Sequence, residues 1–167
     1  MADNLSSSST YSQEFTRYLI AFLSGFTAVL LFHQGVLSIL HAVGLTPVTP
    51  FPTQLTQPFG LPQIWSLSFW GGIWGLVFAG VDRWFPKGGG YWVMALIFGS
   101  IFPNIVAWLI VFPLKGIPVG GGWHAAGLAT GLMINGAWGL GTALFLRGFS
   151  KTAKKSPQRI LELLTSL

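Results

Sequence analysis

The sequence predicts an all-α membrane protein, a bundle of four transmembrane helices with a short C-terminal amphipathic helix. Two observations lead to this fold class. Hydrophobic residues make up 51% of the 167 residues and charged residues only 8%, whereas soluble domains carry about 25% charged residues. Four apolar segments are long enough to cross about 30 Å of hydrocarbon, at about residues 18–44, 63–81, 91–112 and 123–147. We therefore expect one four-helix transmembrane domain over residues 13–147.

The first helix is expected over residues 18–44. Its opening half is apolar, and polar side chains enter at His33, Gln34 and His41. Residues 1–12 are serine-rich and lack an apolar period, which favours a disordered N-terminal tail. After the helix, five prolines within an uncharged stretch exclude a helix and favour extended polyproline II or turns. The apolar residues of that stretch indicate a loop on the membrane interface or against a partner.

Small residues mark the other three helices as packing elements. The second helix contains Gly71 and Gly75, a spacing that lets another helix approach closely. The third has Pro103 in its middle, which should bend it. The fourth carries a ladder of residues spaced by four around one amide: Gly127, Gly131, Asn135, Gly139 and Ala143. The ladder predicts close helix packing along one face.

Residues 148–167 change character and are interpreted as a basic linker followed by an amphipathic surface helix. The basic residues are Lys151, Lys154, Lys155 and Arg159. Apolar residues follow at helical spacing in a single stripe: Ile160, Leu163, Leu164 and Leu167. A stripe of this kind beside a basic cluster is typical of a helix lying on a membrane surface. A frayed tail is the alternative interpretation.

The basic residues predict an orientation. If the N-terminus is cytoplasmic, eight of the nine Lys and Arg residues lie on the inner side, and only Lys115 lies outside. Cytoplasmic segments of membrane proteins carry such an excess, so both termini are expected in the cytoplasm. The net charge is +5, with the cations placed beside apolar segments. This placement favours membrane lipids as partners and excludes nucleic acid.

Polar residues are expected near the middle of the membrane at His33, Gln34, Asn104 and Asn135. A buried amide without a partner costs several kcal/mol in hydrocarbon, so these groups should meet each other or line a wet cavity. One interpretation is interhelical hydrogen bonding. The other is a hydrophilic midplane site in which His33 titrates. No acidic residue lies inside the predicted helices, which weakens proton- or sodium-coupled transport.

The sequence gives little support to metal, cofactor or enzyme chemistry. Cysteine is absent, which removes thiolate ligands and nucleophiles. His41 and His124 are weak candidates for a metal or haem iron because no carboxylate accompanies them. The segment FWGGIWG of the second helix could hold a pigment or a lipid tail, although groove filling explains it as well. No catalytic motif is present, so we expect neither an enzyme nor a bound cofactor.

Two main functions and a weaker third remain from the sequence. The first is a structural or accessory subunit that self-associates or docks to a larger membrane complex through its glycine-rich helix faces. The second is a small channel or transporter with a midplane polar site. A haem- or pigment-binding protein is the weaker third.

The segments FHQG, PFGLP, SLSFWGGIWG, FPNIVAW, PLKG and NGAWGLGTAL resemble a group of small four-helix bacterial membrane proteins of unassigned function. The resemblance covers about Phe32 to Leu146 and omits both tails. It implies a prokaryotic inner or internal membrane and a single compact unit. It carries over no catalytic or ligand residue.

Overall fold

The computed structural model describes residues 14–150 in full and, for residues 2–13 and 151–165, the course of the backbone alone. Within residues 14–150, four helices are long and apolar enough to cross a membrane: Glu14–Ala42, Gln63–Trp84, Gly89–Leu114 and Ala125–Ser150. Their ends lie within a few residues of the predicted ones. The predicted disordered tail and the basic surface helix, with Lys151, Lys154, Lys155 and Arg159, lie outside the fully described residues and stay predictions.

The first and third spans are interrupted helices. In the first, α1 (Ala2–Ala28) passes through a π-helical turn, η1 (Val29–His33), into α2 (Gln34–Ala42). In the third, α4 (Gly89–Val106) passes through η3 (Ala107–Val111) into α5 (Phe112–Leu114). Turns of this wide type often mark functional sites inside helices. Pro103 lies inside α4, one turn before η3.

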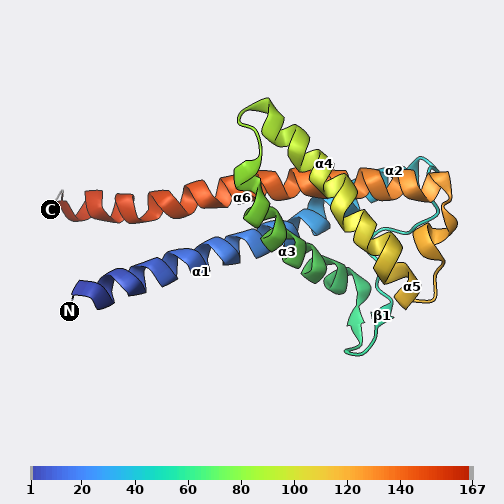
Figure 1. Cartoon of the computed structure of the whole chain (residues 1–167), viewed down its shortest axis with the longest axis horizontal. Helices are drawn as coiled ribbons and strands as arrows, with labels where there is room; N and C mark the ends of the chain where they lie inside the picture. The colour runs from blue at the N-terminus through green and yellow to red at the C-terminus, as the bar shows by residue number, and fades with distance from the viewer. Residues whose placement is uncertain (1, 166–167) are drawn as a thin grey trace.

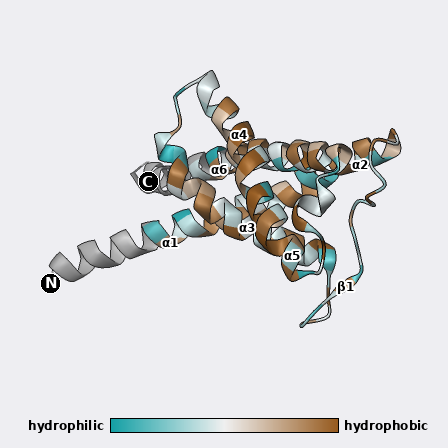
Figure 2. Cartoon of the chain, turned by 45° about the vertical axis from the view of Figure 1, so that its right-hand side comes forward, coloured by the Kyte–Doolittle hydropathy of each residue, from teal (hydrophilic) through white to brown (hydrophobic). Residues whose placement is uncertain are grey.

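The second span is α3 (Gln63–Val81) with a 3-10 turn at its end, η2 (Asp82–Trp84), and the fourth lies within the single helix α6 (Ala125–Thr165). Another 3-10 turn, η4 (Val119–Gly122), lies in the connection before α6. Figure 1 shows α1 and α6 side by side in opposite directions along the molecule, with α3 and α4 crossing them obliquely. Figure 2 shows hydrophobic residues along α3, α4 and the part of α6 within residues 125–150.

The uncharged loop after α2 contains a small antiparallel hairpin, a β element that the all-α prediction does not include. Its strands are β1 (Leu55–Thr56) and β2 (Leu61–Pro62), with Leu55 opposite Pro62 and Thr56 opposite Leu61. In Figure 1 the hairpin projects sideways from the bundle, across the long axis of the molecule. The remainder of the loop has no regular structure, as its prolines predict.

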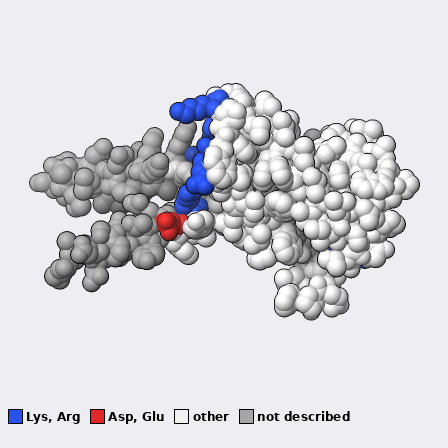
Figure 3. Space-filling view, in the orientation of Figure 1, with Lys and Arg blue, Asp and Glu red and all other residues white. Residues whose placement is uncertain are grey.

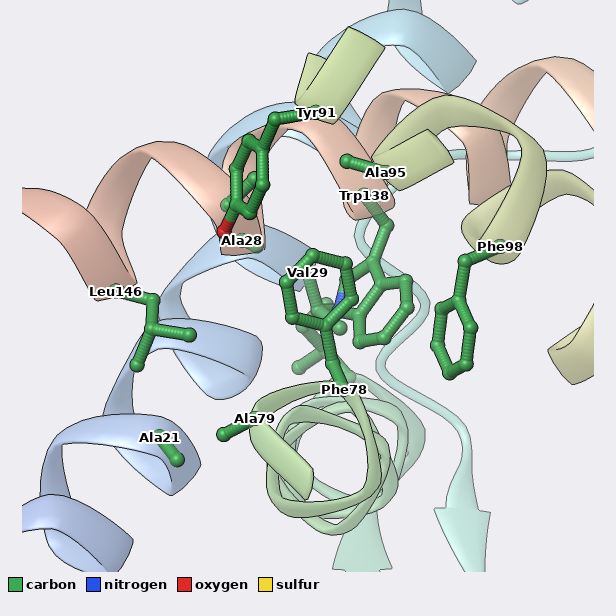
Figure 4. Close-up of a cluster of buried hydrophobic side chains, with 12 residues drawn as sticks. Ala21, Ala28, Val29, Phe78, Ala79, Tyr91, Ala95, Phe98, Trp138 and Leu146 are labelled. Carbon is green, nitrogen blue, oxygen red and sulfur yellow. The ribbon is translucent and has the colours of Figure 1, made fainter. Parts of the chain in front are cut away.

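The core lies where the four spans meet (Figure 4). Its largest side chain is Trp138 of α6, which is 2% exposed. Phe78 of α3 and Phe98 of α4 pack edge to face with ring centroids 5.3 Å apart. Small residues complete the core where helices approach closely: Ala21, Ala28, Ala79, Ala95 and Ala143. The bundle is therefore closed by a few aromatic rings surrounded by alanines.

The first half of the described chain, residues 14–84, and the second half, residues 89–150, repeat one another. Residues 71–85 of the second span and 135–149 of the fourth are identical at seven of 15 positions, in the pattern GxWGLxxAxxxRxF. In the first half these positions are Gly72, Trp74, Gly75, Leu76, Ala79, Arg83 and Phe85, and each has its counterpart 64 residues later. The first and third spans share an Ala-x-x-x-Gly pair, residues 21 and 25 in one and 95 and 99 in the other.

The helix ends repeat as well. The N–H of Leu45 donates to the carbonyl of Leu40, and the N–H of Ile117 donates to that of Phe112, each five residues back. The residue before each donor is a glycine with positive φ, +74° at position 44 and +70° at position 116. This is the Schellman cap, in which glycine permits the left-handed turn. Each half is thus one helical hairpin whose first helix contains a π-helical turn.

Candidate functional site

In each half the two helices cross at a point where their backbones are in contact, α1 with α3 and α4 with α6. A Cβ added to Gly75 of α3 would collide with the carbonyl oxygen of Ala21 and lie 3.0 Å from the Cα of Gly25. Small residues let helices approach in this way in membranes. Gly71 lies at the same crossing, where its Cβ would lie 3.0 Å from the carbonyl oxygen of Gly25. The two glycines that the sequence pairs on the second helix therefore face the first helix.

The second half repeats this contact atom for atom. A Cβ on Gly139 of α6 would collide with the carbonyl oxygen of Ala95 and lie 3.0 Å from the Cα of Gly99. One turn further along α6, Ala143 is fully buried. The face of α6 that carries these residues is thus covered by α4 of the same chain.

Other helices of the same chain cover the small-residue ladder only in part. A Cβ on Gly131 would lie 2.9 Å from Oδ1 of Asn104, whereas one on Gly127 would meet nothing within 4 Å. Gly127 lies about 18 Å along the helix from Gly139, three turns beyond the crossing. Helices that cross obliquely diverge away from the contact point, so the outer end of the ladder is open.

Two of the predicted midplane amides meet across the second crossing. Asn135 donates through Nδ2 to Oδ1 of Asn104 over 2.9 Å, and Asn104 donates through its own Nδ2 to the carbonyl of Ser100 over 2.7 Å. Asn104 is 2% exposed. Gly131 leaves the space that the Asn104 amide fills. The pair joins α4 to α6 and fits the interpretation of these amides as interhelical hydrogen-bonding groups.

The other two predicted midplane residues make a separate set of contacts. Gln34 is fully buried, and its Oε1 accepts a 2.6 Å hydrogen bond from the backbone N–H of Phe51. Its Nε2 lies 3.3 Å from Nδ1 of His33. Phe51 has a φ of +49°, which is uncommon for a residue with a side chain. Gln34 therefore anchors the proline-rich loop instead of completing one polar ring with the two asparagines.

The loop is also fixed where it meets α3. The N–H of Ile64 donates to the carbonyl of Pro52 over 2.9 Å, and that of Gln63 donates to the carbonyl of Gln54 over 2.8 Å. Between these anchors the hairpin exposes its apolar side chains, 71% of Leu55 and 82% of Phe59. The result is a firmly held backbone that presents hydrophobic side chains outward.

His41 and His124 lie at the exposed ends of their helices. His41 donates through Nδ1 to the carbonyl of Thr46 over 3.2 Å and so helps to hold the start of the loop. His124 lies beside Gly122, whose added Cβ would be 3.2 Å from its Nε2. Within residues 14–150, no group of three or more His, Cys, Asp or Glu side chains could hold a metal ion.

A polar network joins all four spans at the end of the bundle opposite the proline-rich loop. Tyr91 of α4 donates to Oδ2 of Asp82 over 3.4 Å, and the Arg147 guanidinium of α6 lies 3.4 Å from the centre of the Tyr91 ring. Arg17 of α1 donates to the carbonyl of Ala79 in α3 over 2.8 Å. The charges of Arg17 and Arg147 both act on Asp82. Figure 3 shows the Lys and Arg side chains of this end as one band.

Several residues that make these contacts are not among the predicted site residues. Gly25 and Gly99 complete the two crossings, and Trp138 donates through Nε1 to the carbonyl of Gly25 over 2.9 Å. A comparison of the chain with itself would have found Trp138 and Arg147, because the repeat places them at the positions of Trp74 and Arg83.

The resemblance to small bacterial membrane proteins stays a prediction. A comparison with family models, with curated proteins and with solved structures finds no match to this chain.

Proposed function

We propose that this chain is a non-enzymatic integral membrane protein of a prokaryotic inner or internal membrane, with both termini in the cytoplasm. Its proposed role is that of a structural or accessory subunit in a larger membrane complex. The observation that carries the proposal is the hairpin of β1 and β2, which projects sideways (Figure 1), holds no charge and exposes apolar side chains.

The glycine-rich faces support docking less well than the hairpin does. Gly71 and Gly75 contact α1, and Gly139 contacts α4, so a partner would have to displace a helix of the same chain to reach them. The hairpin needs no such rearrangement. We therefore place the docking surface on residues 55–61 of the loop.

The chemistry of the hairpin specifies the kind of partner. Phe59 lies at its tip and is 82% exposed, and no residue between positions 43 and 62 is charged. Such a surface fits the apolar side of another transmembrane helix. The bond from Phe51 to Gln34 holds the loop before any partner arrives, which lowers the conformational entropy lost on binding.

The channel or transporter alternative would use Gln34, Asn104 and Asn135 as a polar path. Their side chains bond to other protein groups, Gln34 to the loop and the asparagines to each other. These bonds favour a packing role. A haem-binding role for His41 and His124 would give a Soret band in the absorbance spectrum of the purified protein.

Site-specific photo-crosslinking in membranes tests the docking proposal. A photoreactive residue replaces Phe59 in one variant and Leu31 in the control, which is 60% exposed on the helical surface. We expect a discrete protein adduct from position 59 and only lipid adducts from position 31. Lipid adducts alone from both positions would contradict the proposal. If Asn135→Leu also changed solute flux in reconstituted vesicles, the transporter would be the better account.

A further inference from the structure

The internal repeat places arginines at equivalent positions with unequal surroundings. Arg83 and Arg147 occupy the same position of the repeated pattern, at the ends of the second and fourth spans. The spacing that relates Ala21 to Ala95 relates Arg17 to Tyr91. The first half therefore carries two arginines where the second half carries an arginine and a tyrosine.

In the second half the guanidinium of Arg147 lies over the aromatic rings of Tyr91 and Trp92. The Cζ of Arg147 lies 3.4 Å from the centre of the Tyr91 ring and 5.4 Å from that of Trp92. A guanidinium over the face of an aromatic ring is stabilised by about 0.5–2 kcal/mol. The aromatic residue thus provides a favourable position for the cation inside the protein.

In the first half no tyrosine stands at the equivalent position, and both arginines are exposed. Arg17 donates one bond to the carbonyl of Ala79, and Arg83 lies 4.3 Å from the centre of the Trp84 ring. The nearby carboxylate of Asp82 interacts with the charges of both Arg17 and Arg147. Among residues 14–150, the cations at this end are Arg17, Arg83, Lys87 and Arg147, and the carboxylates are Glu14 and Asp82.

We propose that Arg17 and Arg83 bind the phosphate of an anionic membrane phospholipid such as phosphatidylglycerol. Arg17 lies near the start of the first apolar span and Arg83 at the end of the second, where lipid headgroups would lie. An arginine guanidinium binds a phosphate through two parallel N–H···O hydrogen bonds. Trp84 provides the interfacial ring beside this site. The bound phosphate offsets the excess of cations over carboxylates that residues 14–150 carry at this end.

The test uses the full-length protein in detergent and measures bound lipid by native mass spectrometry. Phosphatidylglycerol and zwitterionic phosphatidylcholine are titrated onto the unaltered protein and onto Arg83→Gln, Lys87→Gln and Lys115→Gln. We expect preference for phosphatidylglycerol, and an affinity about five-fold lower in Arg83→Gln, since a juxtamembrane cation contributes about 1 kcal/mol. Lys115→Gln, at the other end, should bind as the unaltered protein does.

Three outcomes would overturn the proposal. Equal losses in Arg83→Gln and Lys87→Gln would show a diffuse surface charge instead of a site. Equal binding of both lipids would remove the selectivity. Displacement of the lipid by excess inorganic phosphate would assign the site to free phosphate. Arg17→Gln should repeat the loss seen at Arg83, with an unchanged unfolding transition showing that the variant is folded.

Discussion

The indole Nε1 of Trp138 donates a 2.9 Å hydrogen bond to the carbonyl oxygen of Gly25, 113 residues earlier in the chain. This bond joins the fourth span to the first and thereby the second half of the chain to the first. The repeat counterpart of Trp138, Trp74, instead packs against Phe98 with ring centroids 6.2 Å apart. The two halves therefore use the same tryptophan in different ways.

Trp138→Phe should lower the free energy of unfolding by about 1–2 kcal/mol, since it removes an interhelical hydrogen bond and leaves a small void. Trp74→Phe, at the partly exposed counterpart, should cost less. Unfolding in mixed detergent and SDS micelles measures both variants. Equal losses would show that the bond to Gly25 adds nothing specific.

Gly75→Ala and Gly139→Ala should each destabilise the bundle by about 1–3 kcal/mol, because the added methyl group has no room at either crossing. The matched control is Gly80→Ala on the same helix as Gly75, where a Cβ meets nothing within 4 Å. This control should leave stability unchanged or raise it by up to about 1 kcal/mol. Destabilisation of the control by a similar amount would contradict the crossing geometry.

Asn104→Ala and Asn135→Ala should be coupled in a double-mutant cycle. Interhelical hydrogen bonds in membranes contribute about 0.6 kcal/mol on average and about 1.7 kcal/mol at most, and we expect a coupling energy in this range. The same unfolding assay supplies the four measurements. A coupling energy near zero would mean that the two amides do not depend on each other in the folded protein.

Gln34→Leu should release the proline-rich loop. The substitution removes the acceptor of the Phe51 N–H, and an unsatisfied buried donor costs about 1–3 kcal/mol. Hydrogen exchange of the loop amides should therefore speed up by about ten-fold or more. Gln54→Leu, an exposed position in the same loop, is the control and should exchange as the unaltered protein does. A slow Phe51 amide in Gln34→Leu would show that other contacts hold the loop.

Single cysteines can test the predicted orientation, because the chain contains none of its own. Lys115→Cys should react with a membrane-impermeant thiol reagent on intact cells, and Lys87→Cys only after the inner membrane is made permeable. Both positions are exposed in the folded protein. Labelling of both cysteines from the same side would contradict the predicted four crossings.

The spans could be predicted from the sequence because membrane-crossing length is a local property of about 20 apolar residues. Contacts between helices depend on rotation and crossing point, which the sequence does not state directly. Asn104 and Asn135 share a predicted depth and do meet. Gln34 shares that depth and bonds to Phe51 instead, because the loop folds back onto the helix end. Depth alone therefore does not identify partners.

The glycines of α6 show a second limit on what could be predicted from the sequence. A spacing of four residues identifies one helix face, and Gly127 and Gly139 both lie on it. Only Gly139 lies near the point where α6 crosses α4. The position of that point follows from Ala95 and Gly99 on the other helix, so the pattern of one helix predicts a face and two matching patterns are needed to predict a contact.

The repeat of two helical hairpins also constrains how such a chain can grow by gene duplication. If each helical hairpin crosses the bilayer twice, as proposed, it returns to its starting side, and a second copy joined to it would enter from the same leaflet with its charges on the same side. No inversion of topology is needed, as it would be for a unit with an odd number of crossings. After fusion each half would be free to diverge, as the different partners of Arg83 and Arg147 illustrate.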